Sequence, residues 1–137
     1  MIEKAIMAWL KTQSTITSKV STRIYFIRAP QYDTATALPY IVFEKVSHIQ
    51  SLVLGGASSF VESRIQFAIH GQTYAEVKDI AVALKSLLNA YLAGTVATKM
   101  GGITWVQAIN IDNELDGIDP ITDMYYVIVD AMFFYIE

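Results

Sequence analysis

The chain has 137 residues, a length that predicts a single domain covering residues 1–137. Hydrophobic residues make up 53% and charged residues 17%, which excludes a disordered chain, and the absence of cysteine excludes disulfide scaffolds, cysteine-based zinc modules and thiol nucleophiles. The formal net charge is −3, whereas proteins that track a nucleic-acid groove are usually basic, so we expect no sequence-specific nucleic-acid partner.

The first predicted element is a short amphipathic helix. Four apolar residues recur at helical spacing and would form its buried face: Ile2, Ile6, Trp9 and Leu10. Residues 14–22 are rich in Ser and Thr, and we expect them not to be helical because these side chains compete for backbone hydrogen bonds. Residues 23–27 are β-branched and aromatic, a composition typical of a short strand.

The next two predicted strands are residues 40–47 and 60–70, in which side chains alternate between two faces. Residues 48–59 connect them as a long uncharged loop, with Gly55 and Gly56 as its turn signal. The tip of this loop is apolar: Leu52, Val53 and Leu54. An apolar tip is expected either to be buried in a neighbouring molecule or to be functional.

A longer helix is predicted after residue 72. Thr73 and Glu76 form a T-x-x-E capping box, a regular apolar stripe follows, and Gly94 supplies the stop signal. Two further strands are predicted at residues 103–111 and 124–136, joined by an acidic loop at residues 112–123.

The last predicted strand is apolar on both faces, with Tyr125, Val127, Val129 and Phe133 on one, and Tyr126, Ile128, Met132 and Phe134 on the other. A half-exposed antiparallel strand should alternate, so this strand is expected to be covered twice, the second time by another subunit. The predicted fold class is α+β, in the order α-β-β-α-β-β. It has an antiparallel sheet of about four strands, two helices packed on one face, and a possible extra short strand at residues 23–27.

The charges divide the chain into two parts. Residues 1–99 hold all 10 basic residues and 6 acidic ones, a net +4, and residues 100–137 hold 7 acidic residues and no basic one, a net −7. Opposite charges favour head-to-tail association of copies. We hypothesise that Arg23 and Arg28 are among the basic subunit contacts, and that reversing Asp116, Asp119 and Asp123 to Lys abolishes assembly.

The acidic loop overlaps the pattern of an EF-hand calcium loop. Four acids stand at loop positions 1, 3, 5 and 12: Asp112, Glu114, Asp116 and Asp123. The loop lacks a bidentate Glu at its last position, has Asp119 where an apolar residue is usual, and is flanked by predicted strands instead of helices. An ordinary turn or a subunit contact is therefore favoured, and we expect no metal site.

No pattern predicts catalysis. The two histidines, His48 and His70, have no cysteine to complete a common zinc set, and they are interpreted as surface or interface residues. The glycine pairs match neither the dinucleotide fingerprint nor the P-loop, and there is no G-x-S-x-G elbow. We expect the chain not to be an enzyme and to bind no cofactor.

We also expect no membrane partner and no signal peptide. The longest uncharged stretch, residues 46–61, is interrupted by polar residues and glycines. The apolar run at residues 5–10 is shorter than the hydrophobic region of a signal peptide, so a cytosolic product is expected.

Two polar surfaces are open to more than one interpretation. The first is interpreted as an edge strand guarded by arginines, in preference to a base-stacking surface: Arg23, Tyr25, Phe26 and Arg28. The second is a sheet face that is either solvated or a set of inter-subunit ion pairs: Lys45, Glu62, Arg64, Gln66, Gln107 and Asp130.

Residues 23–30, 38–44 and 64–78, the long helix after them, and a last strand containing Asp130 together carry a family resemblance. Over nearly its whole length the chain resembles the tail-completion, or tail-terminator, proteins of long-tailed bacteriophages and prophages. The resemblance implies an α+β virion subunit, assembled in the bacterial cytoplasm. It would form a ring, usually a hexamer, on the last disc of the tail tube at the head–tail junction.

Such a ring would end tube polymerisation and present the surface to which the head connector docks, with no catalysis and no cofactor. Its partners would be its own copies, the major tail tube protein and a head connector or neck protein. We expect Leu52, Val53 and Leu54 to contact the tail tube. Two alternatives stay open: another neck component, such as a head-closure or adaptor subunit, and a dimeric α+β module that binds a ligand or acts as an enzyme.

Overall fold

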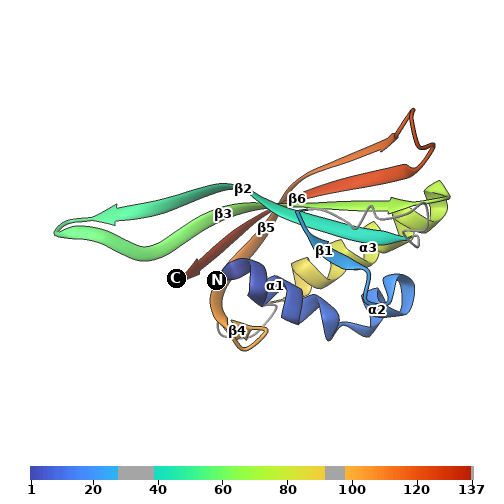
Figure 1. Cartoon of the computed structure of the whole chain (residues 1–137). Coiled ribbons are helices and arrows are strands. Elements are labelled where there is room, and N and C mark those ends of the chain that lie inside the picture. The colour runs from blue at the N-terminus through green and yellow to red at the C-terminus, as the bar shows by residue number, and fades with distance from the viewer. Residues whose placement is uncertain (28–38, 92–97, 137) are drawn as a thin grey trace.

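The computed structural model describes residues 1–27, 39–91 and 98–136. Its elements follow in the order α1 (Ile2–Lys11), α2 (Ser14–Val20), β1 (Ile24–Phe26), β2 (Tyr40–Val53), β3 (Gly56–Gly71), α3 (Tyr74–Ala90), β4 (Thr98–Met100), β5 (Thr104–Ile118) and β6 (Tyr125–Ile136). The strands form one sheet in the order β1-β2-β3-β6-β5-β4. The β1–β2 pair is parallel and all other pairs are antiparallel. Figure 1 shows that the sheet is strongly twisted and that the helices gather on one side of it.

The predicted fold class is therefore wrong. The described residues form six strands in a mixed sheet and three helices, where about four antiparallel strands and two helices were expected. The short strand predicted at residues 23–27 is present as β1, but its parallel pairing with β2 makes the sheet mixed. Strand β4 was not predicted; it pairs with the start of β5 and buries Met100.

The Ser- and Thr-rich passage is helical, contrary to expectation. In α2, Ile16 and Val20 stand one turn apart, and both are fully buried where α2 contacts α1 and α3. Burial of an aliphatic side chain contributes roughly 1.5–3 kcal/mol. That gain outweighs the poor helix propensity of Ser and Thr, which costs at most about 0.7 kcal/mol per residue.

Residues 48–59 are not a long loop. Strands β2 and β3 stay paired to Val53 and Gly56, with two register shifts, and only Leu54 and Gly55 form the turn. Gly55 has a φ of +98°, a conformation that suits glycine. Because β6 pairs with β3 only as far as Phe60, residues 51–59 belong to a free hairpin, called the arm below, which projects beyond the helices in Figure 1. A strand with no core to face has no reason to alternate, so the sequence pattern did not reveal it.

The predicted acidic loop is also mostly strand, because β5 continues to Ile118. The remaining turn is closed by two backbone hydrogen bonds, from Asp119 N to Met124 O at 2.9 Å and from Asp123 N to Asp119 O at 2.8 Å. The expectation of a loop over residues 112–123 is therefore wrong, and the first three acids of the EF-hand-like pattern, at which no metal site was expected, lie on β5. Among the residues with assigned positions, no group of three or more acidic or histidine side chains could hold a metal ion.

The predicted cap by Thr73 is confirmed at the start of α3, whereas the Glu76 carboxylate accepts a hydrogen bond from Gln72 N at 3.3 Å instead of from Thr73 N. The Thr73 hydroxyl accepts a hydrogen bond of 3.2 Å from Glu76 N. The apolar stripe is buried against β3, β5 and β6, and the helix ends at Ala90. The expected stop at Gly94 lies outside the described residues. None of the helices in the described segments is long and apolar enough to cross a bilayer.

Candidate functional site

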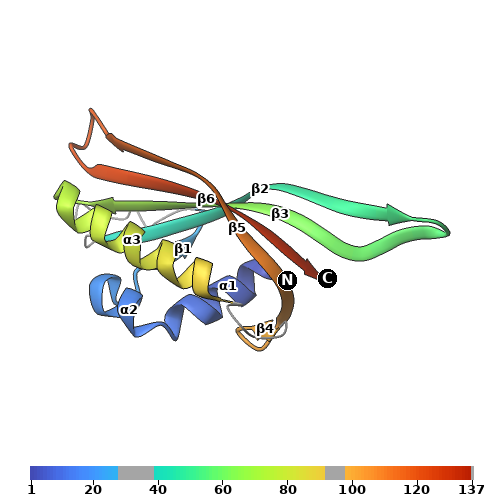
Figure 2. The same cartoon turned by 180° about the vertical axis from the view of Figure 1, so that it is seen from behind.

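One face of the sheet carries no helix in the described chain, as Figures 1 and 2 show from opposite sides. Successive side chains of a strand point to opposite faces, so every second residue of β3 and β6 lies on this helix-free face. The other half lies under the helices and is buried, including Phe67 on β3 and Val129 and Phe133 on β6. The helix-free face consists mainly of Glu62, Arg64, Gln66, Ala68 and His70 on β3, and Tyr126, Ile128, Asp130, Met132 and Phe134 on β6.

An apolar strip runs along β6 on the helix-free face. Its four members, Tyr126, Ile128, Met132 and Phe134, are only half-buried. On the neighbouring strand β5, Leu115 and Trp105 extend the strip and are 55% and 44% exposed. The strand was expected to be covered on both faces, yet the described part of the chain covers only one. The subunit-interface role of these four residues stays a prediction.

The centre of this face holds an ion pair. Arg64 Nη2 donates a hydrogen bond of 2.6 Å to Asp130 Oδ2, and this contact raises the pKa of Arg64. Within the described residues, Arg64 Nε and Asp130 Oδ1 are buried without a hydrogen-bond partner. The sequence prediction had placed Lys45 on the same face, but its partner in the register is the buried Ile65, and it pairs at 3.1 Å with Glu3 on α1.

A second charge cluster joins β5 to α3. Lys78 Nζ lies 2.9 Å from Glu114 and 3.0 Å from Asp116, and Lys85 Nζ lies 2.7 Å from Glu114. The Tyr74 hydroxyl donates to Asp116 at 2.6 Å. These contacts lower the pKa of both carboxyl groups, chiefly through Lys85 for Glu114 and through Tyr74 for Asp116. Part of the opposite charge of the two chain segments is thus neutralised within one molecule.

The other predicted contact residues are spread over the molecule. Asp123 is exposed at the β5–β6 turn, and Leu54 at the arm tip is 105% exposed. Arg23 Nε donates to Pro39 O at 2.8 Å, within the same chain. Arg28 and the side chains of Leu52 and Val53 lie outside the described residues. The roles predicted for these residues and for Asp116 and Asp119 stay predictions.

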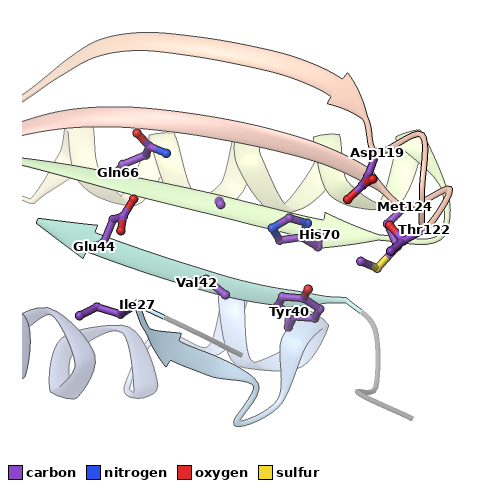
Figure 3. Close-up of a pocket in the computed structure, with 10 residues that line it drawn as sticks. Ile27, Tyr40, Val42, Glu44, Gln66, His70, Asp119, Thr122 and Met124 are labelled. Atoms are coloured by element: carbon purple, nitrogen blue, oxygen red, sulfur yellow. The ribbon is translucent and has the colours of Figure 1, made fainter. Parts of the chain in front are cut away.

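A pocket of about 400 Å³ lies at one end of the helix-free face (Figure 3). Its floor comes from β2 and β3, and its wall from the β5–β6 turn. The rings of Tyr40 and His70 stack with centroids 5.0 Å apart, and His70 Nδ1 is buried without a hydrogen-bond partner in the described residues. Burial lowers the pKa of His70, and the negative charge of Asp119 opposes this shift. The pocket is lined by Ile27, Tyr40, Val42, Glu44, Gln66, Ala68, His70, Asp119, Thr122 and Met124.

Sequence reasoning missed this pocket and interpreted His70 as a surface or interface residue. Pairing the two predicted strands, 40–47 and 60–70, in the observed register would have placed Tyr40 beside His70, and this was the sequence signal that could have indicated the site. The contribution of Asp119 could not be foreseen, since it depends on where the β5–β6 turn folds back. His48 lies elsewhere, with its Nδ1 atom 3.2 Å from the Ser63 hydroxyl.

No protein-family model matches the chain, and no curated protein matches it by sequence. Solved structures do match by fold. One is a chain from the virion of a native gene transfer agent particle, similar with a TM-score of 0.76 and 14% sequence identity over 99% of this chain and 95% of that chain. This chain therefore has the fold of a component of a virion particle.

Proposed function

We propose that this chain is a structural virion protein of a long-tailed phage or prophage. In this role it forms a ring that caps the tail tube, ends tube polymerisation and provides the surface for head joining. The observation that carries the proposal is the likeness in fold to a virion chain over 99% of the length. The resemblance of several sequence segments to tail-terminator proteins supports the finer assignment. The role requires no catalysis and no cofactor, and we propose none.

The helix-free face supports assembly. An antiparallel sheet can leave one face in water when that face is polar, but here β6 presents an apolar strip with exposed Leu115 and Trp105 beside it. Burial of such a strip by a neighbouring copy would stabilise the assembly by about 25 cal/mol per Å² of apolar surface. A head-to-tail contact joins two different surfaces of neighbouring copies, and it gives a ring when the rotation between copies closes. The helix-covered side and the helix-free face of this molecule are two such different surfaces.

The arm supports a contact outside the ring. A two-stranded hairpin is at best marginally stable alone in water, so a projecting one gains from a partner. Leu54 at its turn is fully exposed. We propose that the arm lies against the last disc of the tail tube, where a cap must bind to stop further addition.

The test is tube assembly in vitro from the major tail protein of the same phage. Adding the purified chain is expected to arrest elongation and leave a ring at one end of each tube in electron micrographs. Tubes that elongate unchanged, while the chain binds filled heads, would overturn the terminator role in favour of a head-closure or adaptor subunit.

A further inference from the structure

The pocket at the end of the helix-free face is a candidate site that the proposed ring does not require. We propose that it is a socket for a cationic side chain, an arginine or a lysine, presented by a neighbouring protein. The inference rests on the proposed function only in that a virion assembly would bring such a neighbouring protein into contact with the pocket. The socket itself belongs to the single chain and can be tested without a ring.

The charge of the lining selects a cation. Among the described residues, the lining includes two carboxylates, Glu44 on β2 and Asp119 on the β5–β6 turn, and no lysine or arginine. Figure 3 shows them on opposite sides of the hollow, with Gln66 beside Glu44. Asp119 is held in place because its Oδ1 atom accepts a hydrogen bond of 2.9 Å from Ile121 N. The same contact lowers the pKa of Asp119, so the group is anionic at neutral pH.

The aromatic pair supplies a second attraction. Tyr40 and His70 stack with their planes 24° apart, and Tyr40 is only 9% exposed. A guanidinium or ammonium group is attracted to the face of an aromatic ring, and here it could approach only the small accessible part of Tyr40 and the half-buried His70 ring. Because burial lowers the pKa of His70, the imidazole is neutral near pH 7 and does not repel an incoming cation. Its Nδ1 atom, which has no hydrogen-bond partner among the described residues, is a further polar group within the site.

Size and wall chemistry fit a long side chain better than the alternatives. A volume of about 400 Å³ lies within the range of ligand sites, and Val42, Ala68 and Met124 can contact an aliphatic stem. Both charged side chains of the described lining are carboxylates, which would repel an anion. A wholly apolar group would remove water from both carboxylates without replacing their hydrogen bonds.

The test uses the free protein and three capped tripeptides, Gly-Arg-Gly, Gly-Lys-Gly and the uncharged isostere Gly-citrulline-Gly. The chain has two histidines, so imidazole NMR signals report His70 in the pocket and His48 outside it. The cationic peptides are expected to move the His70 signal to saturation while the His48 signal stays fixed. The citrulline peptide is expected to bind more weakly.

Variants localise the effect. Glu44→Gln is expected to weaken binding of the arginine peptide roughly two- to fivefold, the range for a partly exposed ion pair. Glu62→Gln, on the same face but outside the lining, is the matched control and is expected to bind as the parent does. The proposal is overturned if the citrulline peptide binds equally well, if Glu44→Gln binds unchanged, or if no peptide moves the His70 signal. None of these results bears on tube capping, which is measured separately.

Discussion

Asp130 on β6 accepts a hydrogen bond of 2.6 Å from Arg64 on β3, in the middle of the helix-free face. The two partners are unequally exposed, with 42% of the Arg64 side chain and 8% of the Asp130 side chain accessible. Water can therefore solvate the guanidinium if its partner is lost, but it reaches the carboxylate poorly. This asymmetry gives the pair a testable signature.

We expect Arg64→Ala to destabilise the fold more than Asp130→Asn. The first variant leaves a buried carboxylate without its ion-pair partner, which costs about 3 kcal/mol. The second keeps a neutral acceptor for a partly solvated cation and is expected to cost about 1 kcal/mol. Urea unfolding of both variants measures the difference. Equal losses, or a larger loss for Asp130→Asn, would show that the pair is not buried as described.

His70 is expected to make stability depend on pH. Burial lowers the pKa of His70 in the folded state, so the unfolded chain binds a proton more readily. The free energy of unfolding should therefore decrease as the pH falls below about 6.5, and should level off below the folded pKa. His70→Phe, which keeps a ring beside Tyr40, is expected to remove this slope in thermal unfolding between pH 7 and pH 5. His48→Gln retains His70 and is expected to keep the slope. A slope that persists in His70→Phe would assign the effect to other groups.

A substitution at the arm tip is expected to weaken capping without destabilising the fold. Leu54→Asp should change the free energy of unfolding by less than about 0.5 kcal/mol, because the Leu54 side chain is fully exposed. Under the proposed function it should nevertheless weaken capping and give tubes of uncontrolled length in micrographs. Val82→Asp, on the exposed side of α3 and away from the arm, is the control and should cap normally. Normal tube length with Leu54→Asp would remove the arm from the tube contact.

The sequence could predict elements whose burial pattern is regular. The stripe from Val77 to Leu88 and the Thr73 cap defined α3, and the alternation along β3 placed Phe67 and Ile69 on one face. Prediction from the sequence failed where the local composition favours one structure and the tertiary contacts favour another. Burial of Ile16 and Val20 made a helix of a Ser- and Thr-rich segment, and pairing with β6 made a strand of the acidic segment at Glu114.

The candidate site was foreseen only in part. The doubly apolar pattern of β6 predicted a second cover supplied by another subunit, and that cover stays a prediction; the pattern could be read because it lies in one continuous strand. The intrachain pairing of Asp116 with Tyr74 and Lys78 was not foreseen, because it joins residues 38 to 42 positions apart. The pocket could not be predicted for the same reason, since Asp119 is far in sequence from the residues of β2 and β3 that it meets there.

We propose that the helix-free face is the contact between copies, and native mass spectrometry with electron microscopy tests this contact most directly. The parent chain is expected to form a closed ring, alone or on tail tubes. Ile128→Asp should keep the circular dichroism of the fold but fail to form a ring, whereas Val82→Asp, on the exposed side of α3, should assemble as the parent does. A ring formed undiminished by Ile128→Asp, or a parent chain that stays monomeric even with tubes present, would contradict the account.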